Sequence, residues 1–107
     1  MEESDVIAGL AALAHAVRLQ VFRALVVAGP AGLTPGVMQE GLGIAAATLS
    51  FHLKELSRSG LVSVERESRF LIYRAEIARI NQMVGYLTEN CCAGMACVPQ
   101  PAPACGC

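Results

Sequence analysis

The segment that decides the fold spans residues 48–62 and reads TLSFHLKELSRSGLV. Three of its leucines, Leu49, Leu53 and Leu56, share the spacing of one helical face. This spacing predicts a helix from about Ala45 to Ser59 that buries its leucines and leaves its polar residues in solvent. Gly60 follows at the position where a glycine commonly ends a helix.

Three further helices are expected before this one. Apolar residues recur at helical spacing from Val6 to Ala28, and we expect a bend near His15 that divides this stretch into two helices. The Gly-Pro-Ala-Gly sequence at 29–32 predicts a loop. Thr34 and Pro35 then form the N-cap and first residue of a short third helix, which the Gly-Leu-Gly sequence at 41–43 ends.

A hairpin and a last helix are expected after Gly60. Residues 61–67 and 70–74 are rich in β-branched and apolar side chains, so they predict two strands joined by a tight turn around Ser68. A final helix is expected from about Glu76 to Asn90. The fold class is therefore mainly α with a β-hairpin wing, a winged helix-turn-helix with the element order α-α-α-α-β-β-α.

The chain divides into one domain and a tail. With 107 residues it can build a single modest core, which we place in residues 1–90. Residues 91–107 carry no charge, hold three prolines and contain all five cysteines, so they predict a ligand-binding tail. No apolar run is long enough to span a membrane, and the acidic start does not resemble a signal peptide, which predicts a cytoplasmic protein.

The distribution of charge favours nucleic acid as a partner. The net charge is only −1, but residues 50–74 carry five basic residues against three acidic ones. A helix of the expected kind fits the major groove, and a wing reaches phosphates or the minor groove. The candidate DNA-contacting residues are Thr48, Ser50, His52, Lys54, Arg66 and Arg69. Ser50 and His52 fit equally well a role in packing or phosphate positioning.

Several stretches closely resemble the ArsR/SmtB family of metal-responsive repressors. They are residues 13–19, 48–56 and 59–62 together with Tyr73-Arg74, and the resemblance covers roughly residues 5–90. It implies a homodimer that binds double-stranded operator DNA, with the first and last helices at the interface. The sequence departs from the family at Ala45, Ala46 and Ala47, where relatives often carry polar side chains. Alanine offers only apolar contact, for instance with a thymine methyl group.

The cysteines point to a soft-ion site. They are confined to the tail and are Cys91, Cys92, Cys97, Cys105 and Cys107. Reduced cytosolic thiols argue against disulfides, and the absence of C-x-x-C pairs argues against zinc. Trivalent arsenic takes three thiolates, and Cys91, Cys92 and Cys97 fit this need best. Cys105 and Cys107 are possible third ligands or a relay that hands the ion over.

The family resemblance supports arsenic as the inducer. Thr34, Gly36 and Gln39 occupy the places of the C-x-C-x-x-C motif of many arsenic-responsive relatives, so that site is absent. The tail is similar instead to a subset that binds arsenic through an adjacent cysteine pair and a later cysteine. The expected ligand is As(III) as inducer, with methylarsenite, Sb(III), another soft ion or thiol redox sensing as alternatives.

An enzyme is not expected. No histidine stands near the cysteines, and the glycines at 41 and 43 form too short a motif to bind a dinucleotide. We therefore expect no catalytic residues and no organic cofactor, and the function expected is transcriptional repression released by As(III).

Overall fold

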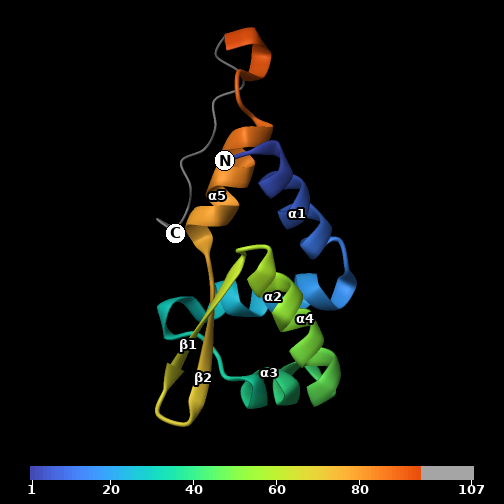
Figure 1. The fold of residues 1–107 in the computed structure, drawn as a ribbon, viewed down its shortest axis with the longest axis vertical. Coiled ribbons are helices and arrows are strands. Elements are labelled where there is room, and N and C mark those ends of the chain that lie inside the picture. The colour runs from blue at the N-terminus through green and yellow to red at the C-terminus, as the bar shows by residue number, and fades with distance from the viewer. Residues whose placement is uncertain (95–107) are drawn as a thin grey trace.

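A computed structural model of the chain describes residues 1–94. The elements confirm the predicted order of four helices, a hairpin and a last helix (Figure 1). Two short 3₁₀ turns complete the described part. In chain order the elements are α1 (Glu3–Leu13), α2 (Ala16–Ala28), η1 (Gly29–Ala31), α3 (Pro35–Leu42), α4 (Ala46–Arg58), β1 (Val62–Glu67), β2 (Phe70–Ala75), α5 (Ile77–Leu87) and η2 (Cys91–Gly94).

Local capping explains where the first helices begin and end. The predicted bend lies at His15, whose Nδ1 accepts a hydrogen bond from the Val17 amide (3.1 Å) and caps α2. Thr34 caps α3 through its hydroxyl, which accepts from the Val37 amide (3.4 Å). Gly43 ends α3 in the left-handed conformation that favours glycine.

The last helix is shorter than predicted. It ends at Leu87 rather than near Asn90. The Thr88 hydroxyl donates to the Val84 carbonyl (2.8 Å), and Asn90 adopts a positive φ of 56° that a continuing helix does not allow.

The hairpin joins its two strands in the predicted way. The antiparallel register runs from Val62 opposite Ala75 to Glu67 opposite Phe70, with a tight turn at Ser68. Ser68 takes the positive φ of 60° that such a turn requires. β1 is buried only at its start and β2 is half-buried from Leu71 onward, where Tyr73 pairs with Leu33, so the tip of the hairpin projects from the body as a wing.

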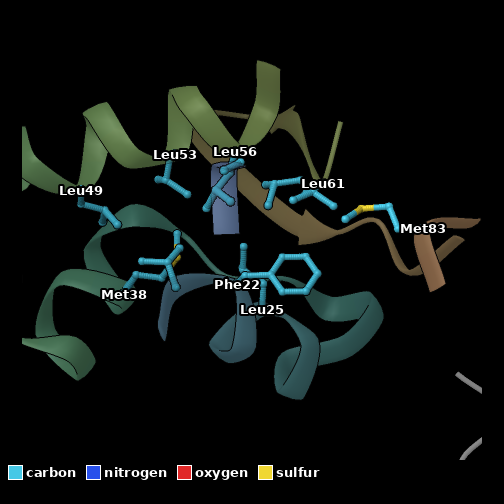
Figure 2. Packing of buried hydrophobic residues seen from close by; sticks show 11 residues of the cluster. Phe22, Leu25, Met38, Leu49, Leu53, Leu56, Leu61 and Met83 are labelled. Carbon is cyan, nitrogen blue, oxygen red and sulfur yellow. The ribbon is translucent and has the colours of Figure 1, made fainter. Parts of the chain in front are cut away.

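The core lies between α2, α3, α4 and the start of the hairpin (Figure 2). The leucines of α4 point toward Phe22 and Leu25 of α2 and toward Met38 of α3, as Figure 2 shows. Leu61 extends this cluster to the wing, and α5 joins it through the buried Met83 and the half-buried Ile80. Burying each such side chain contributes about 1.5–3 kcal/mol, so the predicted leucine face of α4 stabilises the fold.

One apolar surface is left uncovered by the single chain. α1 and α5 lie side by side at one end of the molecule, away from α3 and the tip of the wing (Figure 1). They expose the apolar side chains Ile7, Leu10, Val84 and Leu87, and we call this set the α1–α5 face. Exposed apolar side chains that gather on adjacent helices are typical of a surface that contacts another protein.

No single helix within residues 1–94 is both long and apolar enough to cross a membrane. Residues 3–13 and 16–31 satisfy the length and composition criteria only when taken together, and they are bent by 101° at the break between them.

Candidate nucleic-acid interface

The exposed side of α4 forms the centre of the candidate interface. Leu49, Leu53 and Leu56 are buried, and they fix the opposite side of the helix toward solvent. Thr48, Ser50 and Lys54 are exposed, as predicted. The N-terminal end of α4 and the tip of the hairpin lie at the same end of the molecule, opposite the α1–α5 face (Figure 1).

His52 does not lie on this exposed side, so its predicted place among the DNA-contacting side chains is wrong. Its side chain is only 6% exposed, and its Nδ1 accepts a hydrogen bond from the Arg18 Nε–H (3.0 Å). The His15 ring lies 4.5 Å from it, centroid to centroid. Burial lowers the pKa of His52 below its ordinary value, and the positive potential of His15 and Arg18 lowers it further. His52 is therefore a neutral acceptor that joins α4 to α2.

Phe51 is a residue that the sequence prediction omitted. Its side chain is 54% exposed on α4, although phenylalanine favours the core. The Arg18 guanidinium carbon lies 5.6 Å from the ring centroid, and the His52 ring lies 5.3 Å away at an angle of 65°. The signal in the sequence was its position two residues before Leu53, which places it outside the leucine stripe.

The wing presents the two predicted arginines. Arg66 lies in β1 and Arg69 in the turn directly before β2, and both are exposed. Within residues 1–94 neither takes part in an ion pair, because the neighbouring glutamates of the wing contact a different arginine. Their positive charge is thus available to a polyanion.

Arg74 fixes the wing to the body. Its Nη1 donates to Glu65 (2.8 Å), its Nη2 to Glu67 (3.3 Å), and its Nε to the Pro30 carbonyl (2.7 Å). The hydrogen bond to Glu65 is the main cause that raises the pKa of Arg74; burial opposes this shift, and Glu67 adds to it. The guanidinium therefore holds the hairpin against the loop after α2.

The predicted arsenic ligands lie at the other end of the molecule or beyond the described residues. Cys91 is exposed at the start of η2, and its amide donates to the Thr88 carbonyl (3.0 Å). The side chain of Cys92 is not described, and Cys97, Cys105 and Cys107 fall outside residues 1–94. In the described part no three metal-binding side chains gather. The thiolate site therefore stays a prediction.

A family profile described as a helix-turn-helix domain matches residues 13–65, from the end of α1 into β1. A comparison with curated proteins gives no match.

Solved structures of winged-helix regulators are similar to the chain. The transcriptional repressor BigR from Xylella fastidiosa is 30% identical, with a TM-score of 0.63 over 89% of this chain and 91% of BigR. An ArsR-like transcriptional regulator from Rhodococcus sp. RHA1 is 24% identical, with a TM-score of 0.73 over 85% of this chain and 82% of the regulator. The homodimeric winged helix-turn-helix DNA-binding domain of Mb0332 from Mycobacterium bovis, a possible ArsR-family regulator, is 23% identical, with a TM-score of 0.64 over 90% and 89%.

Proposed function

Because the chain belongs to the ArsR-like winged helix-turn-helix transcriptional regulators, we propose that it represses transcription by binding double-stranded operator DNA and releases it when As(III) binds its C-terminal cysteines. The observation that carries the DNA-binding half is that the N-terminal end of α4, whose Thr48 and Ser50 are exposed, lies at the same end of the molecule as the wing tip (Figure 1). The protein acts in the cytoplasm, where its thiols stay reduced.

DNA is bound by two elements with different roles. α4 enters the major groove and presents Thr48, Ser50 and Lys54. The wing brings Arg66 and Arg69 to phosphates or the minor groove. Contacts to phosphate supply affinity that is independent of sequence and falls with salt.

Lys54→Ala tests this arrangement. Losing one phosphate contact should weaken binding to all duplexes and lower the slope of log K against log salt by about 1. Arg23→Ala is the matched control, because Arg23 is an exposed arginine of α2 and should leave the slope unchanged. An unchanged slope for Lys54→Ala, measured by fluorescence anisotropy, contradicts the proposed docking of α4.

The α1–α5 face supplies the dimer interface in this proposal. Its exposed apolar side chains find a partner in a second copy, related by two-fold symmetry. Sedimentation should give twice the chain mass of 11.2 kDa for the wild type. Val84→Asp places a charge on this face and should give the chain mass, with Val27→Asp on α2 as the control that stays dimeric. If the Val84→Asp variant still sediments as a dimer, the proposed interface is contradicted.

Arsenic acts through linkage between two sites. A ligand releases DNA only if it binds the free and the DNA-bound conformations unequally. Cys91 follows α5, a helix of the proposed interface, so thiolates of Cys91, Cys92 and Cys97 that close on As(III) alter the geometry of the dimer. The spacing of the two α4 helices, and hence the fit to successive major grooves, then changes.

Cysteine variants test the sensor. Arsenite should release DNA from the wild type and from Cys105→Ser/Cys107→Ser, but not from Cys91→Ser/Cys92→Ser. Equal release from all three contradicts the assignment of Cys91 and Cys92 as ligands.

Thiol redox sensing is the second candidate, favoured by the exposure of Cys91 next to another cysteine. Operator binding is measured while the protein is titrated with peroxide and, separately, with arsenite, which distinguishes redox sensing from arsenic sensing. Release by peroxide alone favours the redox switch.

A further inference from the structure

We infer that Phe51 is a specificity-determining residue that contacts a thymine 5-methyl group in the major groove. The inference rests on the proposed function, since it assumes that α4 binds DNA. It goes further by naming the base that this helix prefers and the side chain responsible.

The position of Phe51 puts an apolar surface in the middle of the exposed side of α4. Ala47 lies one helical turn before it and Lys54 one turn after it, and both are exposed. A ring that is 54% exposed between them has no partner in the described part of the chain to cover its outer surface. A groove that receives Lys54 therefore receives Phe51 as well.

The ring is held in place by two contacts within the chain. The Arg18 guanidinium, 5.6 Å from the ring centroid, makes a cation–π contact. Arg18 is itself fixed by its hydrogen bond to the buried His52, whose ring meets Phe51 edge-on at 5.3 Å. This support limits the rotation of Phe51 before DNA binds, which lowers the entropy cost of the contact.

The chemistry of the groove selects the ligand. Base pairs offer hydrogen-bonding groups in the major groove, and the 5-methyl of thymine is the apolar group among them. Phe51 and the exposed alanines at 46 and 47 have no side-chain donors or acceptors, so they favour a methyl group over the polar edges of the other bases. Two-fold symmetry predicts one such thymine in each half-site.

Replacement of thymine by deoxyuridine gives a direct test, because it removes only the methyl group. Duplexes are first selected from a random pool with the wild-type chain, and each thymine of the selected site is then replaced in turn. Wild-type affinity should fall about fourfold per half-site at one symmetric thymine, the loss expected for one buried methyl group. Phe51→Ala should bind duplexes with thymine and with deoxyuridine at that position equally. Val27→Ala, which changes an exposed residue of α2, should show the same loss as the wild type.

The outcomes distinguish failure of the inference about Phe51 from failure of the proposed DNA binding on which it rests. Selection of no duplex defeats the DNA-binding proposal, and with it the inference. A selected site at which Phe51→Ala keeps the full deoxyuridine penalty, or at which no thymine shows a penalty, overturns the inference while DNA binding stands. Phe51→Leu serves if the alanine variant unfolds. This variant should lose less affinity than the wild type when deoxyuridine replaces thymine, and an equal loss contradicts the role of Phe51.

Discussion

Replacing His52 by asparagine should flatten the pH dependence of stability between pH 5 and 7. The folded protein holds His52 neutral, because its Nδ1 accepts from Arg18 and its pKa is lowered by burial and by the charges of His15 and Arg18. In the unfolded chain the same group titrates near 6.5. Below about pH 6.5 the unfolded state therefore binds more protons, so the free energy of unfolding falls as pH falls toward the lowered pKa of the folded state, and then levels off.

The size of the effect follows from one proton. A single histidine can contribute at most about 1.4 kcal/mol per pH unit to the slope. The hydrogen bond that protonation removes joins a charged donor to a buried acceptor, a class worth about 1.5–3 kcal/mol. For a domain of this size, a loss of 1 kcal/mol lowers Tm by about 4 °C.

Urea unfolding followed by circular dichroism, in reductant at half-unit steps of pH, measures this slope. The amide carbonyl that His52→Asn introduces stands near the former Nδ1 and keeps an acceptor for Arg18 without titrating. His15→Asn is the control: asparagine can still cap α2, and burial, the largest cause of the lowered pKa of His52, remains, so most of the slope between pH 5 and 6.5 should persist.

Identical slopes for the wild type and His52→Asn over pH 5–6.5 would refute the reasoning. The buried neutral histidine would then not be the group that takes up the proton on unfolding, and the acid sensitivity would belong to other groups.

Three further substitutions probe the fold, each measured by urea unfolding. Leu53→Ala should cost about 2–5 kcal/mol, because it leaves a cavity beneath α4, while Lys54→Ala on the exposed side should cost under about 0.5 kcal/mol. Thr34→Ala should cost about 1 kcal/mol through loss of the cap to Val37, and Thr34→Ser should retain most of it. Gly32→Ala should cost more than about 1 kcal/mol, since its φ is +68° and a Cβ would lie 2.6 Å from the Tyr73 carbonyl; a neutral result contradicts the described loop.

The parts of the fold that could be predicted are those controlled by neighbours in the sequence. The leucine spacing of α4, the cap at Thr34 and the turn at Ser68 depend on interactions within a few residues, and each lies where the sequence indicated. The end of α5 was wrong by three residues, because the back-bond of Thr88 competes with helix continuation.

The candidate site was harder because its side chains depend on distant partners. His52 was expected in solvent on account of its polarity, but Arg18, 34 residues away, satisfies it in a buried position. Phe51 was passed over because only the polar residues of this helix were considered as DNA contacts, yet the leucines fill the buried side of α4 and leave Phe51 exposed. The burial of His52 is not encoded in local spacing, since it is decided by the partner that α2 brings against α4, whereas the spacing of Phe51 from the leucines did indicate its exposure.

α5, which leads to the proposed arsenic ligand Cys91, is linked to α4, although Cys91 and the proposed DNA-binding surface lie at opposite ends of the molecule (Figure 1). α5 begins directly beside the end of α4: the Glu76 amide donates to the Leu61 carbonyl (2.8 Å), and Gly60 lies so close to Arg79 that an added Cβ would sit 3.0 Å from the guanidinium Nε. Met83 further anchors α5 in the core that holds the leucines of α4. A ligand that displaces α5 therefore acts on these links to α4, namely the Glu76–Leu61 hydrogen bond, the Gly60–Arg79 approach and the core contact of Met83.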